Sequence, residues 1–118
     1  MTHNNAPLLI DFALQNVTIL VMVVVKKLIW DNWNVAHIAR HQVTQEEVEE
    51  VCQGEVVVLD AKKGRLMVAG LTTANRFISV VLDPELQEGV YYPVTARSSS
   101  RKERRHYTAE KGAHDKAA

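Results

Sequence analysis

Two histidines four positions apart are the first residues whose types and spacing could support catalysis. His37 and His41 fall on one face if this segment is helical. The spacing also occurs in metal sites, but the segment reads His37-Ile38-Ala39-Arg40-His41, so the glutamate of HExxH is absent and no third ligand is apparent. We expect no metal here. Because imidazole titrates near neutral pH, His41 is the first candidate for acid–base work and His37 the second, with capping of a helix C-terminus by His41 as the alternative.

Arginines form the second group with chemical potential, because a guanidinium can hold a phosphate through two parallel N–H donors. One ends a predicted strand, three lie on a predicted helix after it, and two begin central strands. The phosphate-binding candidates are Arg65, Arg76, Arg97, Arg101, Arg104 and Arg105. For the helix, the alternative is a solvated basic face that holds no ligand.

Aromatic residues and the cysteine complete the set of candidates. Trp33 and Tyr91 or Tyr92 could stack an unpaired base, although such side chains more often pack in a core. Cys52 is the only cysteine, which excludes an intrachain disulfide and a multi-cysteine metal cluster. Its neighbours are acidic and its helical spacing from Val48 is that of a core position, so we expect a buried thiol and not a nucleophile.

Length and composition indicate one small globular domain. The chain has 118 residues, of which 47% are hydrophobic and 24% charged. Lys+Arg and Asp+Glu number 14 each, so the whole chain has no charge bias toward nucleic acid or membrane. The distribution is uneven, because the segment from Arg97 to Lys111 is basic. The negative charge gathers at Glu46, Glu47, Glu49 and Glu50, which we expect to form a solvated helix face.

The N-terminal stretch is apolar but short of a membrane span. Its longest uninterrupted apolar run, Ile19 to Val25, falls well below the ~20 residues of a spanning helix. There is neither a basic n-region nor a clear cleavage site for a signal peptide. We expect residues 1–27 to form an extension with an edge strand, and we expect the protein to be cytoplasmic. The alternative is an interaction protein anchored to a membrane through this apolar N-terminus. A natural start at Met22 would explain the extension, and N-terminal peptide mapping tests it.

Two short helices are expected to follow a strand at Val23 to Trp30. Asp31 can cap a helix over residues 32–40, and Thr44 opens a capping box that predicts a second helix stopped by a left-handed Gly54. The first helix has two different faces. Its expected inward stripe is Val35, Ile38 and Ala39, and its other face carries Trp33, His37, Arg40 and His41.

From residue 55 the hydrophobic period changes to that of strands. Four strands are predicted, at Glu55 to Asp60, Arg65 to Leu71, Arg76 to Leu82 and Val90 to Arg97, and their short connections indicate an antiparallel meander. Pro93 requires a bulge or an unpaired edge in the last strand. A capping box at Ser100 opens a basic helix that should end at Gly112, before a loose tail over residues 112–118. The fold class is therefore α+β, with two short N-terminal helices, a four-stranded mainly antiparallel sheet and a C-terminal basic helix.

Several segments, taken in order, resemble a known family. Ile29-Trp30-Asp31 is followed by Arg40-His41-Gln42-Val43-Thr44 and Glu46-Glu47, similar to the passage KHG-V-S-x-E-E. Arg65 with Gly70, and Arg76 before Phe77 to Val81, look like two central strands. Thr95-Ala96-Arg97-Ser98 through Arg101-Lys102-Glu103-Arg104-Arg105-His106-Tyr107 is similar to the closing pattern SARKATRHERRRYE. The family is BrnT, the ribonuclease toxins of toxin-antitoxin systems, and the resemblance covers residues 28–107 of an expected domain at 28–111.

The resemblance implies a RelE-like ribonuclease fold, RNA cleavage that arrests translation, and a DNA-binding antitoxin as partner in a hetero-oligomer, without a small-molecule cofactor. Metal-independent cleavage requires acid–base groups and stabilisation of the phosphorane. His41 is the first candidate for the acid–base work and His37 the second, and Arg97 would hold the scissile phosphate. RNA would be held by Arg65, Arg76, Arg101, Arg104, Arg105, Trp33 and Tyr91. The alternative is a non-catalytic RNA- or protein-binding module that retains the fold.

Overall fold

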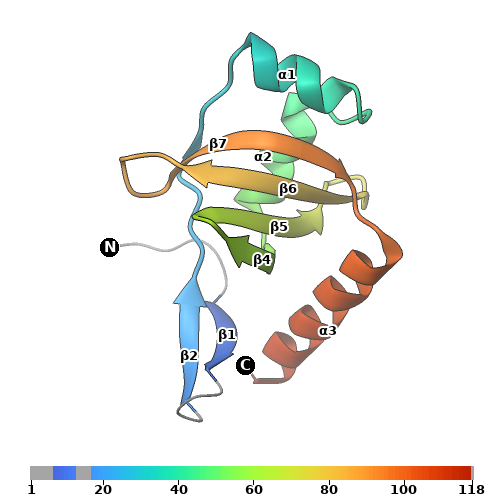
Figure 1. Ribbon diagram of the computed structural model, residues 1–118. Helices are drawn as coiled ribbons and strands as arrows, with labels where there is room; N and C mark the ends of the chain where they lie inside the picture. Colours follow the sequence, from blue (N-terminus) through green and yellow to red (C-terminus); the bar gives the residue numbers. More distant parts are fainter. Residues whose placement is uncertain (1–6, 13–16, 118) are drawn as a thin grey trace.

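The computed structural model describes the backbone of residues 7–12 and 17–117 and the side chains of residues 23–112 (Figure 1). Its main sheet has five strands in the order β3-β7-β6-β5-β4. They span Lys27–Leu28 (β3), Val57–Lys62 (β4), Arg65–Leu71 (β5), Phe77–Pro84 (β6) and Val90–Ser98 (β7). The three helices are α1 (Asn32–Ala39), α2 (Gln45–Gln53) and α3 (Arg101–Ala117). The α+β class is confirmed.

The predicted antiparallel meander is present as β4 to β7, but the sheet has a fifth strand. The strand expected at Val23 to Trp30 is reduced to β3, which pairs in parallel with the start of β7. The amides of Lys26 and Lys27 both donate to the carbonyl of Gly89, at 2.8 and 3.2 Å. The segment before α1 is therefore mainly a connector that pairs with the sheet only beside the start of β7. The prediction of a four-stranded sheet was one strand too few.

Pro93 lies at a bulge in β7, beyond Val90 and Tyr91, the two residues of β7 that pair with β3. The β6–β7 register changes from Val81 opposite Thr95 to Leu82 opposite Pro93, which leaves one extra residue in β7. This is the bulge that a proline without an amide hydrogen requires. The Pro93 carbonyl, released from the ladder, accepts a hydrogen bond at 3.1 Å from the Asn34 side chain of α1.

The N-terminal extension contains a hairpin that the sequence did not predict. Strands β1 (Pro7–Phe12) and β2 (Val17–Met22) pair antiparallel as a separate two-stranded sheet, instead of supplying one edge strand. Residues 1–6 of the extension lie outside the described residues, and these include Met1, the alternative start to Met22. Among the helices described, none combines the length and apolar character needed to cross a membrane.

The two faces of the sheet are covered by different helices. Ile78, Val80 and Leu82 of β6 are fully buried in the core with residues of α1 and α2, and α2 lies behind the sheet in Figure 1. Side chains alternate along a strand, so Phe77 and Ser79 point to the opposite face. There they meet α3, through an edge-to-face contact of Phe77 with Tyr107 and a hydrogen bond of Ser79 to Glu103. The second face therefore positions α3.

The first helix begins as predicted but is rotated from its predicted orientation. Asp31 is the N-cap and shares a capping box with Asn34. The buried residues of α1 are Asn34 and Ile38, whereas Val35 is 37% exposed and Ala39 is exposed, so the predicted inward stripe was wrong at two of three positions. The cause is Asn34, whose amide donates to the carbonyls of Ile29 and Pro93 and ties the helix to β7 through its polar side.

Two glycines behave differently from the sequence prediction. Gly54 follows α2 with φ −92°, an extended conformation and not the predicted left-handed one. α3 continues through Gly112 to Ala117, so the predicted stop and most of the loose tail were wrong; Ala118 lies outside the described residues. A glycine permits a left-handed stop but does not impose one, and residues 101–111 already form a continuous helix that Gly112 can extend.

Gly70 in β5 is required for contact between the sheet and α2. A Cβ at this position would lie 3.0 Å from Val51 Cγ1 and 3.2 Å from the Glu55 carbonyl oxygen. We expect Gly70→Ala to lower the free energy of unfolding by at least about 1 kcal/mol, as overpacking of a core does. Urea denaturation measures it. Gly54→Ala is the matched control, because its Cβ meets only ordinary contacts from 3.5 Å, and an equal loss in both variants would contradict the steric explanation.

Cys52 is confirmed as a core residue. Its side chain is 1% exposed within the cluster that joins α2 to the sheet. Burial, helped by the charge of Glu49, raises the pKa of the thiol to about 12. A thiol this hard to ionise is not a nucleophile at neutral pH.

Candidate nucleic-acid interface

The N-terminal half of α3 presents three arginines on one side. Ser100 caps the helix: its hydroxyl accepts from the amide of Glu103 at 3.1 Å, and Glu103 accepts in return from the amide of Ser100 at 2.9 Å. Residues three and four positions apart share a helix face, so Arg101, Arg104 and Arg105 emerge together. All three are exposed. The capping box predicted from the sequence thus sets where this face begins.

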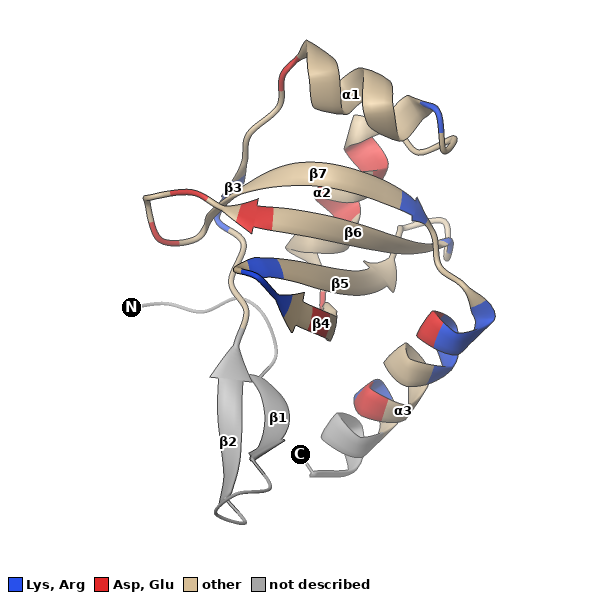
Figure 2. Cartoon of the chain, in the orientation of Figure 1, with Lys and Arg blue, Asp and Glu red and all other residues tan. Residues whose placement is uncertain are grey.

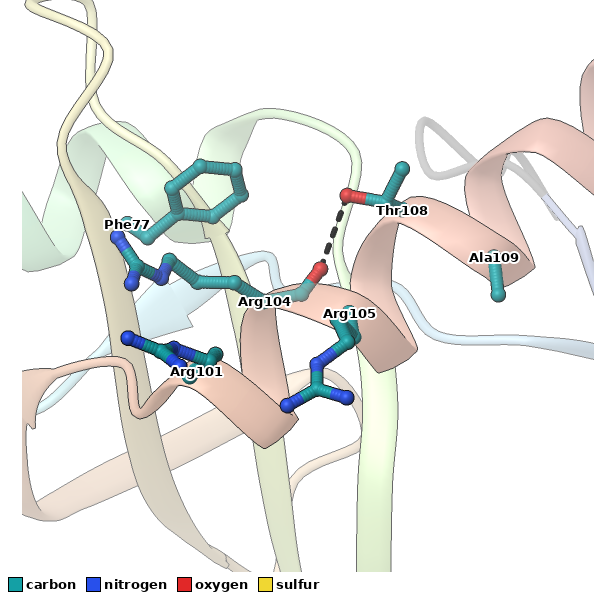
Figure 3. A pocket seen from close by; sticks show the side chains of 6 residues that line it. All are labelled: Phe77, Arg101, Arg104, Arg105, Thr108 and Ala109. Carbon is teal, nitrogen blue, oxygen red and sulfur yellow. Dashed lines mark hydrogen bonds between the residues drawn. The ribbon is translucent and has the colours of Figure 1, made fainter.

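These arginines surround an apolar hollow of about 670 Å³ against the sheet (Figure 3). Its lining consists of Phe77, Arg101, Arg104, Arg105, Thr108 and Ala109. In Figure 3 the side chains of Arg101 and Arg104 extend toward the Phe77 side, whereas Arg105 points away from it. Tyr107 packs edge-on against the Phe77 ring at 5.6 Å between centroids, which fixes the floor of the hollow. We call this site the α3 pocket.

The guanidinium groups of the α3 pocket have no hydrogen-bond or ion-pair partner among the described residues. The other three candidate arginines are all neutralised. Arg65 donates to Asp83 at 2.8 Å, Arg76 to both oxygens of Glu47 at 2.8 Å, and Arg97 to both oxygens of Glu103 at 2.8 and 2.7 Å. Among the six candidate arginines, the guanidiniums available to an anionic ligand are therefore those at the start of α3, where Figure 2 shows a blue segment.

Glu103 is the centre of the network that attaches α3 to the sheet. Its carboxylate receives both terminal nitrogens of Arg97, the hydroxyl of Ser79 at 2.9 Å and the amide of Ser100. Since Ser79 donates its single hydrogen to Glu103, the 2.7 Å contact between Ser79 and Ser99 must have Ser99 as donor. The Arg97 hydrogen bonds, with those from Ser100 and Ser79, lower the pKa of Glu103 to about 2. Arg97 therefore binds Glu103 and helps to attach α3 to the sheet.

The acidic face of α2 is not merely solvated, contrary to the sequence prediction. Glu47 binds Arg76, Glu49 accepts from the Trp30 indole at 2.8 Å, and Glu50 accepts from the amide and hydroxyl of Thr73. Burial acts to raise the pKa of Glu47, but hydrogen bonds from Thr44 and Arg76 outweigh it and the pKa is lowered. These carboxylates fasten α2 to neighbouring strands and loops, and they occupy Arg76.

A ladder of three rings lies along α1. Trp33 stacks on His37 with 4.7 Å between centroids and an angle of 8° between planes, and His37 meets His41 edge-on at 5.6 Å. Trp33 is 56% exposed, so one indole face is covered by His37 and the other can receive a planar ligand. The predicted common face of Trp33, His37 and His41 is confirmed. The two imidazoles are those of His37 and His41, and an imidazole can both accept and donate a proton.

The tyrosines of β7 are less available than the sequence suggested. Tyr91 is half-buried against the core, and this burial raises the pKa of its hydroxyl. Tyr92 donates to both carboxylate oxygens of Asp31, at 3.1 and 3.0 Å, and so supports the start of α1. Neither ring lines the α3 pocket.

Comparison with known protein families finds no match, and no curated protein matches the sequence. Function must therefore be argued from the chemistry of the site. Among the described residues no group of three or more His, Cys, Asp or Glu side chains could hold a metal ion.

The candidate residues fall into two groups. The ring ladder belongs to α1 and the free arginines to α3, and no hydrogen bond, ion pair or ring contact among the described residues joins the two groups. In Figure 1 the C-terminal end of α1 and the N-terminal end of α3 lie on the same side of the molecule, above and below the end of β7. Sequence reasoning missed Phe77, which the alternation Phe77, Ser79 against Ile78, Val80 could have assigned to the α3 face.

Proposed function

We propose that the protein binds single-stranded RNA through the α3 pocket and cleaves it as a toxin resembling BrnT. The observation that carries this proposal is the contrast among the arginines: the three around Phe77 lack partners among the described residues, while Arg65, Arg76 and Arg97 are each paired with a carboxylate. Guanidiniums bind phosphates bidentately, and an aromatic ring beside them can stack a base. An apolar floor with an arginine rim suits this combination.

In this proposal cleavage is carried out by the imidazoles of α1. His41 removes the proton of a ribose 2′-hydroxyl, the oxygen attacks the adjacent phosphorus, and protonated His37 gives its proton to the departing 5′-oxygen. The products are a 2′,3′-cyclic phosphate and a 5′-hydroxyl. Trp33, stacked on His37, offers its open face to a neighbouring base. A cytoplasmic location and neutralisation by a DNA-binding antitoxin in a hetero-oligomer belong to the same proposal.

A specific observation favours a second candidate, RNA binding without cleavage. Arg97, which would stabilise the phosphorane, has both terminal nitrogens held by Glu103. To reach a phosphate it must exchange a short bidentate ion pair for the ligand. If this exchange does not occur, the free arginines still bind RNA but the transition state lacks its strongest positive group.

The two candidates are separated by induced expression of the full chain, with growth and RNA integrity as readouts. We expect growth arrest with loss of RNA, and relief of both by His41→Ala. His106→Ala is the matched control, because His106 is an exposed histidine on α3 that does not line the α3 pocket. Retained RNA binding with intact RNA would support the second candidate. A folded protein that neither arrests growth nor binds RNA would contradict both.

A further inference from the structure

The loop between β6 and β7 carries an exposed leucine between acidic residues. Leu86 is 108% exposed, and its neighbours Glu85, Gln87 and Glu88 are also exposed. The Glu85 and Glu88 side chains form no hydrogen bond or ion pair with the described residues. An apolar side chain displayed between two free carboxylates has the composition of a ligand for a pocket that is apolar inside and basic at its rim.

This acidic loop is held in one conformation. The amide of Glu85 donates to the Val90 carbonyl at 2.8 Å, and the amide of Val90 donates to the Gln87 carbonyl at 3.1 Å. Gly89 closes the turn with φ 82°, and its carbonyl accepts from two amides of the connector before α1. A loop that is already ordered loses little conformational entropy on binding, so Leu86 is presented in a form ready to dock.

The α3 pocket is complementary to this loop in polarity and charge. Phe77 and Ala109 supply apolar surface for a leucine, and three unpaired guanidiniums face two unpaired carboxylates. Asp83, at the base of the loop, is already bound to Arg65 and takes no part. Glu103, the acidic residue that lies between these arginines in α3, is already bound to Arg97.

The two complementary surfaces cannot meet within one molecule. The acidic loop precedes β7 and α3 follows it, and β7 has 9 residues. At about 3.3 Å per residue the strand separates them by roughly 25 Å. Figure 2 shows the red loop at one end of the strands and the blue start of α3 at the other.

We propose that the acidic loop of one copy of this chain docks in the α3 pocket of a second copy, with Leu86 on Phe77 and Glu85 and Glu88 between the arginines. Two different surfaces are used, so the contact is head-to-tail, and an open assembly keeps a free loop at one end and a free pocket at the other. The area involved is small, which makes the association weak, and its ionic part makes it sensitive to salt. This inference does not depend on the RNA proposal.

The test is sedimentation velocity of the full chain without RNA, at micromolar to millimolar concentrations and low salt. We expect the average mass to rise with concentration, and Leu86→Asp and Arg104→Glu each to remain monomeric. Both residues are exposed, so neither substitution disturbs the core. Val35→Asp is the matched control: it places a charge on another exposed apolar side chain and should associate like the natural chain.

Mixing the two variants distinguishes head-to-tail docking from other contacts. Leu86→Asp retains an intact pocket and Arg104→Glu an intact loop, so an equimolar mixture should form dimers and no larger species. A mixture that stays monomeric would overturn the proposal, as would a natural chain that is monomeric throughout. Association that survives in either single variant would place the interface elsewhere and overturn it equally.

Discussion

Glu103→Gln should lower the free energy of unfolding at neutral pH by about 2–3 kcal/mol, because one carboxylate holds the sheet and α3 together. The amide that replaces it keeps the size of the side chain but removes the charge that binds both terminal nitrogens of Arg97. Breaking a charge-assisted pair also leaves the other partner without its counter-charge, which adds to the loss. Urea denaturation of the two proteins at pH 7 measures the difference.

The same carboxylate predicts an acid-dependent loss of stability. Its pKa is about 2 in the folded protein against an ordinary 4.5, a depression caused first by the hydrogen bonds from Arg97 and then by those from Ser100 and Ser79. A lowered folded-state pKa contributes stability that is complete above pH 4.5 and is lost as the pH falls toward 2. The difference in stability between the natural chain and Glu103→Gln should therefore shrink across this window.

Asp83→Asn is the control for both measurements. It removes a carboxylate that also binds an arginine at 2.8 Å, but the pair is exposed, with 52% and 37% of the side chains accessible. Exposed pairs contribute about 1 kcal/mol or less, because water and salt screen them. If Asp83→Asn cost as much as Glu103→Gln, or if the pH dependence were unchanged in Glu103→Gln, Glu103 would not be the centre of the network.

Local sequence signals predicted most of the elements. Asp31, Thr44 and Ser100 each satisfy orphan amides at a helix start, so the caps fixed three helix starts to within a residue. Short turns with glycine or a positive φ, such as Lys63-Gly64, determined the meander. These signals lie within four residues of what they specify, which is why they can be recognised without a structure.

Long-range pairing could not be predicted in the same way. The parallel strand β3 depends on residues more than sixty positions away in β7, and two paired residues leave no periodic pattern. The burial of Asn34 could not be predicted for the same reason. A polar side chain is expected to face solvent, but the amide of Asn34 is buried because it donates to the carbonyl of Pro93, which is distant in sequence. The acidic face of α2 was misjudged for this reason also, because its partners come from other elements.

The candidate site was predicted in composition but not in grouping. The sequence identified six of the seven arginines as phosphate-binding candidates, yet it could not separate the three of these that are free from the three that bind carboxylates. That separation depends on which acidic residue folding brings near each guanidinium: Asp83 is 18 positions from Arg65, and Glu47 is 29 positions from Arg76. Arg97 and Glu103 are only six positions apart, on either side of the start of α3. Their ion pair is the one of the three that the local sequence could have predicted.

Replacing Arg101, Arg104 and Arg105 together with alanine should weaken binding of a single-stranded RNA oligonucleotide at least about 100-fold at low salt. Each guanidinium that contacts phosphate makes charge-assisted hydrogen bonds, and losing three of them removes several kcal/mol of binding free energy. The salt dependence should change as well. For single strands the slope of log K against log salt falls by about 0.7 per lost phosphate contact, so three contacts reduce it by about 2.

Net charge alone would also weaken RNA binding, so the control must remove as much charge from elsewhere. Replacing Lys27, Lys62 and Lys63 with alanine does so, because all three are exposed, none belongs to α3 and none lines the α3 pocket. We expect this control to lose much less affinity, and Arg65→Ala to resemble the natural chain, since Arg65 is bound to Asp83. Fluorescence anisotropy across a salt series measures both quantities, with Leu86→Asp as the common background so that docking between copies does not compete. Equal losses in the two triple variants would show that RNA responds to overall charge, and the contrast between free and paired arginines would then have no bearing on function.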